Sequence, residues 1–286
     1  MIRIIATEEL SISQQREVEA LEAVVQEEEG LQSRLFLSNR LNWNPRLPCF
    51  FLAYLSSHLV SALVAFFPTE EEVEFTGFTD PDHRNKGYFS LLVKRALAQY
   101  ATAPFTRALF CVEATSGPGQ AYLARRYPDI ERSEYLMALH RHEYTPTPQA
   151  GTLVPVTRIN AEEAARLMSR IFNSDLQRSR DRISLMLLEE GRKVYTYHRR
   201  GLPLGVLNAQ RQGPSTYMIY GVGILEEHRS SGHGKAMMNL ALAALFEEAE
   251  TLNLEVESTN EAAITLYTNL GFLPVMQMDY HRLTLV

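Results

Sequence analysis

The sequence predicts an α/β fold with a mixed sheet of the α+β type, present in two tandem copies. An internal repeat indicates the duplication. His83–Gly87 (HRNKG) reappears as His228–Gly232 (HRSSG), an offset of 145 residues, and Val112–Ser116 (VEATS) reappears as Val256–Asn260 (VESTN), an offset of 144. Matches in the same order at nearly one offset are typical of a duplicated chain.

A third match and a linker agree with this interpretation. Glu134-Tyr135 corresponds to Asp279-Tyr280, again 145 residues apart. Between the copies, Tyr144–Gly151 (YTPTPQAG) is polar and rich in Pro and Gly, so we expect it to be extended and exposed. The sequence therefore predicts an N-terminal domain at residues 1–148 and a C-terminal domain at residues 149–286.

The order of expected elements predicts the type of sheet. In the second half we expect a strand, two helices, three antiparallel strands, a long helix, a strand, a helix and a closing strand, at residues 153–157, 160–171, 181–190, 194–198, 204–210, 217–225, 235–252, 254–257, 261–270 and 276–285. Asn160 with Glu163 reads as a capping box for the first of these helices. In the first half we expect strands at residues 50–54, 59–67 and 73–78 and a helix at residues 89–100. Antiparallel strands followed by β-α-β favour a mixed sheet over a doubly wound parallel one.

Composition limits the compartment and the partners. The chain of 286 residues has 45% hydrophobic and 22% charged residues and no apolar run long enough to span a membrane, and its first residues do not resemble a signal peptide. Two cysteines are too few for a disulfide framework, so we expect a cytoplasmic protein. The net charge of −6 disfavours a nucleic-acid partner. The acidic stretches Glu8–Glu29 and Glu70–Glu74 are interpreted as solvated faces.

The strongest local motif is Arg229-Ser-Ser-Gly232-His-Gly234, between an expected strand and a long helix. Its glycines let the backbone turn tightly and approach a ligand. The helix that follows directs unpaired N–H groups and the positive end of its dipole toward that ligand, which suits a pyrophosphate. Two glycines before a helix also occur in ordinary turns, so a second motif is needed before this one indicates ligand binding.

The partner is the segment Leu254–Phe272. It predicts a strand that ends near Asn260, which can cap the next helix, while Ala263 leaves room for close approach and Gly271 ends the helix in a left-handed conformation. Tyr267 lies seven residues after Asn260 and so on about the same helix face. A buried Tyr needs a polar partner for its hydroxyl. The alternative for Tyr267 is a plain core residue.

Together, Arg229-x-x-Gly232-x-Gly234 and Asn260-x-x-Ala263-x-x-Leu266-Tyr267-x-x-x-Gly271-Phe272 resemble the GNAT acyl-CoA transferases. The resemblance covers about residues 152–286, and the tandem arrangement is similar to that of mycothiol synthase. It implies two tandem GNAT folds and acetyl-CoA as co-substrate.

The resemblance also implies a role for each matching position. Main-chain N–H groups at the loop would hold the pyrophosphate: those of Ser230, Ser231, Gly232, His233, Gly234 and Lys235. Arg229 is also expected to take part in binding the coenzyme. The backbone of Val222, Gly223 and Ile224 would pair with the pantetheine arm and polarise the thioester carbonyl. Asn260 and Ala263 would contact the coenzyme, and Tyr267 would protonate the leaving thiolate as general acid.

A general base is harder to assign. Glu226, Glu227 and Glu257 are candidates, and each is equally well read as a solvated charge at the end of a strand. Glu226 stands where many relatives carry Pro. His140 and His142 alternate along an expected strand and are interpreted as surface residues. No histidine pair has metal-ligand spacing on one helix face, so no metal is expected.

The first copy departs from the pattern and is expected to be degenerate. Phe89 stands at the position of Gly234, Ser116 at that of Asn260, and Leu123, which has no proton to give, at that of Tyr267. The adjacent Tyr122 is rotated by about 100° on a helix. We expect a non-catalytic copy that binds CoA weakly or acts as a scaffold.

These observations predict an N-acetyltransferase that moves an acetyl group from acetyl-CoA to an amine of a small molecule or peptide, in a ternary complex. The alternative is a non-catalytic acyl-CoA-binding or regulatory protein. A transferase that uses charged RNA would need a basic surface that the composition does not offer. The acceptor stays open, as does the choice between monomer and homodimer.

Overall fold

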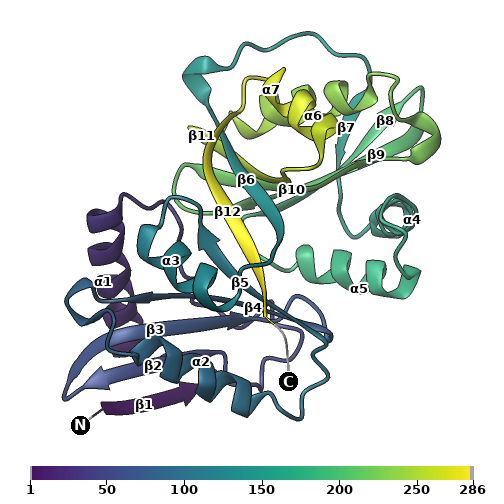
Figure 1. The fold of residues 1–286 in the computed structure, drawn as a ribbon. Coiled ribbons are helices and arrows are strands. Elements are labelled where there is room, and N and C mark those ends of the chain that lie inside the picture. The colour runs from purple at the N-terminus through teal and green to yellow at the C-terminus, as the bar shows by residue number, and fades with distance from the viewer. Residues whose placement is uncertain (1, 284–286) are drawn as a thin grey trace. The chain divides into compact units, whose positions relative to one another are not determined.

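The structure is a computed structural model that describes residues 2–283, and its elements form two similar sets (Figure 1). The first set is β1 (Ile2–Thr7), α1 (Ile12–Glu29), β2 (Phe50–Leu55), β3 (His58–Phe66), β4 (Glu72–Thr79), η1 (Pro81–His83), α2 (Tyr88–Gln99), β5 (Arg107–Glu113), α3 (Gly117–Arg126), β6 (Ile130–His140) and η2 (Arg141–Glu143). The second set is β7 (Thr152–Pro155), α4 (Ala161–Ile171), α5 (Leu176–Met186), β8 (Arg192–Arg199), β9 (Leu202–Arg211), β10 (Thr216–Ile224), η3 (Glu226–His228), α6 (His233–Leu245), β11 (Thr251–Glu257), α7 (Glu261–Thr268) and β12 (Leu273–Leu283). The two halves repeat one order of elements, as the internal repeat predicts, except that α4 and α5 in the second half stand where the first half has α1 alone. Of the predicted closing strand, Thr284 and Leu285 lie outside the described residues.

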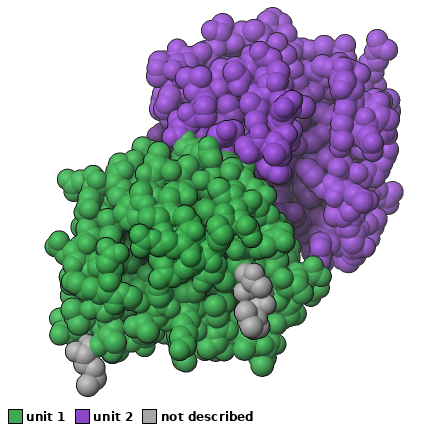
Figure 2. Space-filling model, viewed as in Figure 1, with its two compact units in different colours: residues 1–134, 276–286 green, residues 135–275 purple. Residues whose placement is uncertain are grey.

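Two compact units divide the chain at other places than the repeat does (Figure 2). Unit 1 holds residues 1–134 and 276–286, and unit 2 holds residues 135–275. The cuts fall within β6 and β12, the last strand of each repeat. β12 pairs antiparallel with β5, from Met278↔Glu113 to Leu283↔Ala108. The ranges 1–148 and 149–286 therefore describe the duplication of the sequence, whereas the compact units describe packing.

Each unit contains a mixed sheet, as predicted. In unit 1 the strand order is β1-β2-β3-β4-β5-β12, with β4 and β5 parallel and the other neighbours antiparallel. In unit 2 the order is β6-β11-β10-β9-β8-β7, with β10 and β11 parallel. The pairs β10–β9, β9–β8 and β8–β7 are antiparallel.

The parallel pair of each unit separates toward its C-terminal end. β4 pairs with β5 only from Glu72↔Arg107 to Phe75↔Phe110. β10 pairs with β11 only from Thr216↔Thr251 to Ile219↔Leu254. All four strands continue past these residues. The two strands of each parallel pair therefore diverge at their carboxyl ends, where ligands usually bind in an open α/β sheet.

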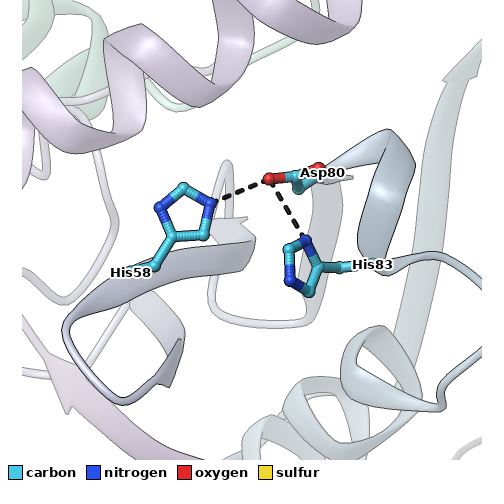
Figure 3. A group of neighbouring side chains, drawn as sticks. All are labelled: His58, Asp80 and His83. Carbon is cyan, nitrogen blue, oxygen red and sulfur yellow. Dashed lines mark hydrogen bonds and ion pairs between the residues drawn. The ribbon is translucent and has the colours of Figure 1, made fainter.

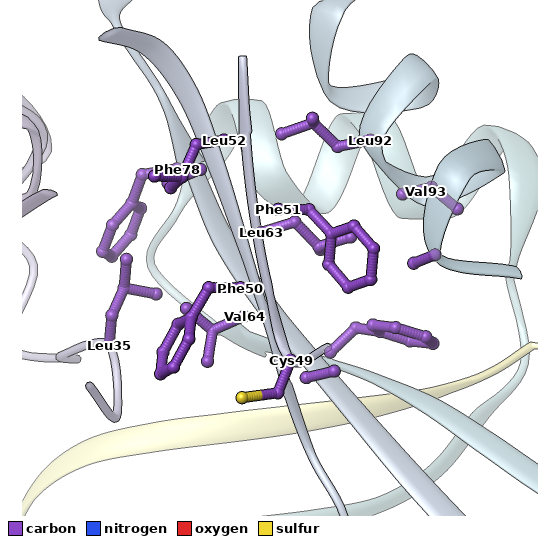
Figure 4. Packing of buried hydrophobic residues seen from close by; sticks show 14 of the residues in the cluster. Leu35, Cys49, Phe50, Phe51, Leu52, Leu63, Val64, Phe78, Leu92 and Val93 are labelled. Atoms are coloured by element: carbon purple, nitrogen blue, oxygen red, sulfur yellow. The ribbon is translucent and has the colours of Figure 1, made fainter. Parts of the chain in front are cut away.

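Helices cover both faces of the unit 1 sheet. Phe50 and Phe51 are neighbours on β2 and point to opposite faces, as alternate residues of a strand do. Figure 4 shows Phe51 on the side of Leu92 of α2, and Phe50 on the side of Leu35. β2 is buried at five consecutive residues from Phe50, a pattern typical of a strand covered on both sides.

The sheet of unit 2 separates two apolar clusters in the same way. Val206 of β9 belongs to the cluster that includes α4 and α5, whereas the next residue, Leu207, belongs to the cluster that includes α6 and α7. The glycine loop and the strand–helix motif therefore lie on the α6–α7 side, and α4 and α5 cover the other face.

Several local predictions were wrong in detail. Asn160 stands at the N-cap of α4 but makes no side-chain capping bond, because its Oδ1 accepts from the N–H of Thr157. The second helix begins at Leu176 instead of residue 181, since Asp175 caps it by accepting from Arg178 N–H at 2.9 Å. The long helix ends at Leu245, not at residue 252. A capping bond thus marks the start of α5 but not that of α4.

The acidic stretches are not simply solvated. Glu74 is half-buried and pairs with Arg132 Nη2 at 2.7 Å, and Glu72 pairs with Arg107. Glu29, at the end of α1, accepts from Arg84 and Ser116. These carboxylates therefore join elements inside unit 1.

The Pro-rich segment 144–151 is irregular and mostly exposed, as predicted, but it is also anchored to unit 2. Tyr144 Oη donates to the carbonyl of Asn239 in α6 at 3.0 Å. Tyr197 Oη donates to the carbonyl of Ala150 at 2.8 Å. The linker therefore adds packing to the second copy.

Gly205 is expected to be essential for the packing of β9 on β10. A Cβ there would lie 2.5 Å from Ile224 Cδ1 and 2.9 Å from the carbonyl oxygen of Gly223, so one strand would have to move. We expect Gly205→Ala to lower the free energy of unfolding by about 2 kcal/mol, as overpacking of a core does. Urea unfolding measures this. The control is Gly117→Ala, where an added Cβ meets nothing within 4 Å. Equal midpoints for the two variants would contradict the prediction.

Candidate functional site

A β-bulge shapes the strand that enters the site. The register of β10 against β9 shifts between Tyr220 and Gly223. Gly221 has φ of +57°, and a Cβ there would lie 2.4 Å from Asn208 Nδ2. The buried Asn208 amide lies 3.4 Å from the Tyr220 carbonyl oxygen. Because a bulge redirects the backbone that follows it, the predicted contact residues Val222, Gly223 and Ile224 follow a defined turn.

These three residues lie beyond the last paired residue of the parallel pair. β10 is hydrogen-bonded to β11 only as far as Ile219, whereas on its other edge Gly223 and Ile224 pair with Val206 and Gly205. The β11-facing edge from Val222 onward is thus available to an extended ligand, as a further strand would be.

The loop between β10 and α6 has the same backbone as its counterpart in unit 1. Ser230 has φ of +58° and Gly232 of +80°; the corresponding Asn85 and Gly87 have +60° and +82°. Such angles favour Gly and are uncommon for Ser and Asn. The sequence repeat therefore encodes one loop conformation, used twice.

An arginine holds each loop against the strand before it. Arg229 Nε donates to the carbonyl of Ile224 at 3.1 Å, and Arg84 Nε donates to the carbonyl of Thr79 at 3.3 Å. Arg229, expected to bind the coenzyme, uses its Nε to fix the loop.

The first turn of α6 has unfilled capping positions and free space. Its N-cap, Gly232, makes no side-chain capping bond. An added Cβ on Gly234 would meet only Leu266 at 3.6 Å and Ile224 at 3.9 Å, which are ordinary contacts. Ser230, Ser231 and Lys235 are exposed. Packing within the chain does not require Gly at position 234, since a methyl group would fit there without a clash.

The second motif lies against this loop, since Leu266 of α7 is the nearest side chain to Gly234. Asn260 caps α7, as predicted, by accepting from the N–H of Ala263 at 3.1 Å. Tyr267 is 7% exposed and contacts the Phe272 ring edge-on at 6.1 Å between centroids. Burial raises the pKa of Tyr267 to about 12, so the hydroxyl stays protonated. The structure thus brings Gly234, Asn260 and Tyr267 into one region.

The three candidate bases are all exposed, but their surroundings differ. Glu227 pairs with Arg170 Nη2 at 2.6 Å. A hydrogen bond from its own N–H, with the charges of Arg170 and His228, lowers the pKa of Glu227 and makes it a weaker base. Glu257, at the end of β11, accepts from Thr259 Oγ1 at 3.0 Å. Glu226 begins η3. Glu226 and Glu257 therefore fit the role better than Glu227.

The histidines of the expected surface pair are exposed, as predicted. His140 ends β6, but His142 lies in η2 and not in a strand, and their rings stack at 5.7 Å. His233 lies beside Tyr197, with its Nδ1 3.5 Å from the hydroxyl.

In unit 1 a cavity of ≈ 850 Å³ lies where β4 and β5 diverge. It is lined by the loop of the first copy, by both strands of its parallel pair and by α3, and three arginines (Arg84, Arg125 and Arg126) face it. Phe89 stands where Gly234 does, and its ring lies edge-on to Tyr122 at 5.1 Å. A pocket of this volume with basic side chains suits a phosphorylated ligand.

Sequence reasoning missed Glu29 at the mouth of this cavity. Its carboxylate accepts from Arg84 Nη2 at 2.6 Å and from Ser116 Oγ at 2.7 Å. Ser116 is the residue that replaces Asn260. The only signal was an acidic run, Glu27–Glu29, and this run resembles a solvated face.

Among residues 2–283, the search for membrane spans finds no helix with the length and apolar character to cross a bilayer. The described cysteines, Cys49 and Cys111, are both free, so neither forms a disulfide.

Comparisons with known proteins agree with this geometry. Residues 160–272 match the acetyltransferase (GNAT) family. A GCN5-related N-acetyltransferase from Sphaerobacter thermophilus is similar in structure, with a TM-score of 0.80 at 16% identity, over 99% of this chain and 96% of that one. No curated protein matches the sequence significantly.

Two further solved structures share the fold over their whole length. A tandem GNAT protein from the clavulanic acid biosynthesis pathway has a TM-score of 0.70 at 16% identity, with 100% of this chain and 99% of that chain covered. A GNAT-family acetyltransferase from Colwellia psychrerythraea has a TM-score of 0.70 at 12% identity, with 98% and 99% covered. The glycine loop and the Asn260–Tyr267 helix lie inside the matched segment, so residues 160–272 match an acetyltransferase domain of the GNAT family, in a chain whose fold resembles that of tandem GNAT proteins throughout.

Proposed function

We propose that the C-terminal copy transfers an acetyl group from acetyl-CoA to an amine of a small molecule or peptide, by direct attack in a ternary complex. The observation that carries this proposal is the placement of Gly234 against Leu266 of α7, the helix that holds the buried Tyr267, where strands β10 and β11 have separated. The uncapped first turn of α6 supports binding of coenzyme A there, because its N–H groups have no side-chain partner. The two free cysteines agree with a cytoplasmic location.

Binding would use backbone more than side chains. The N–H groups from Ser230 to Lys235 would hold the pyrophosphate at the positive end of α6. The open edge of β10 at Val222, Gly223 and Ile224 would bind the pantetheine arm as a strand binds a peptide. Asn260 would contact the arm with the amide nitrogen that capping leaves available, and Ala263 would allow close approach.

The chemistry needs one proton removed and one supplied. Acetyl-CoA supplies an activated acetyl group as a thioester. The amine nitrogen forms a bond to the acetyl carbon, the carbon–sulfur bond breaks, and the electron pair leaves on sulfur. Tyr267 then donates its proton to the sulfur, and Glu226 or Glu257, directly or through water, takes the proton from the amine. N–H groups of β10 would stabilise the oxyanion formed in between.

A second candidate function follows from the cavity of unit 1. Its volume of ≈ 850 Å³ and three arginines favour binding of an acyl-CoA or CoA molecule there. Transfer is not expected, because Leu123 replaces Tyr267 and the hydroxyl of Ser116 already donates to Glu29. That is the non-catalytic alternative, applied to the first copy. Two molecules of CoA per chain in calorimetry would support it, and one per chain, bound more weakly in Gly234→Ala, would contradict it.

Thiol release separates an enzyme from a binding protein. Acetyl-CoA is incubated with a panel of aminoglycosides, polyamines, amino acids and peptides, and free CoA is measured. Release that depends on one class of amine supports the proposal. Tight binding of acetyl-CoA without release on any amine would favour the regulatory alternative.

Tyr267→Phe is expected to lower kcat about 100-fold, because the phenyl ring keeps the packing but has no proton to donate. The KM for acetyl-CoA should change little. Since the pKa of Tyr267 is about 12, the ratio of wild-type to variant kcat should stay constant from about pH 7 to about pH 10. Tyr195→Phe, at another buried tyrosine of unit 2, is the control. Equal kcat for Tyr267→Phe and wild type would remove Tyr267 from this role.

Gly234→Ala is expected to separate stability from binding. The added methyl group meets only ordinary contacts in the chain and favours the helix, so the free energy of unfolding should stay equal or rise by up to about 1 kcal/mol. The Kd for acetyl-CoA should rise about tenfold, equivalent to about 1.4 kcal/mol. Ser231→Ala is the matched loop control. If acetyl-CoA binds Gly234→Ala as it binds wild type, the coenzyme lies elsewhere.

Glu227→Gln is expected to change kcat less than about twofold, because Arg170 holds this carboxylate in an exposed ion pair with little tendency to accept a proton. Glu226→Gln and Glu257→Gln, measured beside it over a range of pH, identify the base by loss of the acidic limb of the profile. A large loss of kcat in Glu227→Gln alone would contradict this prediction and identify Glu227 as the base.

A further inference from the structure

Three side chains of unit 1 converge beside the loop of the first copy: His58, Asp80 and His83 (Figure 3). His58 begins β3, Asp80 follows β4, and His83 ends η1. Asp80 N–H donates to the carbonyl of Val60 at 3.0 Å, which places the carboxylate across from the start of β3. Backbone pairing therefore holds the two segments that carry these side chains.

The donor atoms have separations that a metal ion requires. Asp80 Oδ2 lies 2.9 Å from His58 Nε2 and 3.3 Å from His83 Nδ1, and all three atoms lie within 4.8 Å of one another. Bonds of about 2.0–2.1 Å in a tetrahedral zinc site put neighbouring ligand atoms about 3.4 Å apart. Small rotations of the side chains would bring all three onto one ion.

The donor set has the features of a site and not only of an ion pair. His83 Nδ1 is buried, and its one neighbour of opposite charge is Asp80 Oδ2 at 3.3 Å, without the geometry of a good hydrogen bond. A buried nitrogen that is so weakly satisfied gains from a stronger ligand. The second carboxylate oxygen, Asp80 Oδ1, accepts from Asp82 N–H at 3.0 Å, which orients the carboxylate as outer contacts of metal ligands do.

Unit 2 shows that the turn itself does not need these residues. The positions of His58 and Asp80 are occupied there by Leu202 and Leu225, while His228 matches His83. The short helix forms all the same, with His228 N–H donating to the Leu225 carbonyl at 2.9 Å, as His83 N–H does to Asp80 at 2.8 Å. The first copy alone has the three donors, on a backbone that folds without them.

We propose that His58, Asp80 and His83 form a binding site for a divalent transition metal of the zinc class. Two imidazoles and a carboxylate suit Zn²⁺ and leave a fourth position open. That position faces solvent, since the His58 side chain is 63% exposed. The ion ties the β2–β3 turn to the loop that lines the unit 1 cavity, of which His83 is part. The site is independent of the acetyl transfer proposed for unit 2.

The test is metal binding by the full chain, freed of metal beforehand. Zn²⁺ is titrated by calorimetry, and Co²⁺ is used as a spectroscopic probe of tetrahedral coordination. His58→Leu and the double variant His58→Leu/Asp80→Leu adopt residues that unit 2 already carries at these positions. His142→Gln, at an exposed histidine outside the group, is the control. Circular dichroism without metal checks that each variant is folded.

We expect one Zn²⁺ per chain in wild type and in His142→Gln, and a tetrahedral Co²⁺ spectrum. Binding should weaken at least about tenfold in His58→Leu, the lower end of what even a supporting residue costs a metal site. The midpoint of thermal unfolding should rise with Zn²⁺ in wild type and not in the double variant. Equal Zn²⁺ affinity of wild type and the double variant, or loss of binding in His142→Gln, would overturn the proposal.

Discussion

In each copy the parallel strand pair is hydrogen-bonded for only four residues and then separates, and the site depends on this separation. In unit 2 the bulge after Tyr220 redirects β10, and Asn208 supports it from β9. The separation leaves one edge of β10 without a neighbouring strand, so a ligand could pair with it. If β10 and β11 stayed paired to their ends, this edge would be occupied by β11.

The loop before α6 forms the next part of the site, and two features fix its conformation. Left-handed angles at Ser230 and Gly232 turn the chain, and the Arg229 guanidinium binds the last carbonyl of the strand. The same angles and the same arginine bond occur in unit 1. Duplication has therefore preserved the backbone of the loop, while the side chains around it have diverged.

Because of that divergence, the two copies can perform different chemistry. Unit 2 has the glycine Gly234 in the loop and a protonated phenol at Tyr267. In unit 1, Phe89 and Tyr122 line the cavity and Leu123 cannot donate a proton. The hydroxyl of Ser116 donates a hydrogen bond to Glu29. The carboxylate of Glu29 also neutralises Arg84 at the mouth of the cavity. A first copy that binds without transferring is consistent with these contacts, and the group His58, Asp80 and His83 is a feature of that copy alone.

Local sequence determined the repeat, the order of elements, the glycine loop and the cap at Asn260, because each depends on residues close together in the chain. Only tertiary structure decided that the last strand of each repeat is divided between the two compact units. It also decided that Glu29 reaches Ser116 and that Arg170 pairs with Glu227. Such contacts join residues distant in sequence, and an acidic side chain in a run looks the same whether it faces water or an arginine. The motif could therefore be read from the sequence, but the partner of each charge could not.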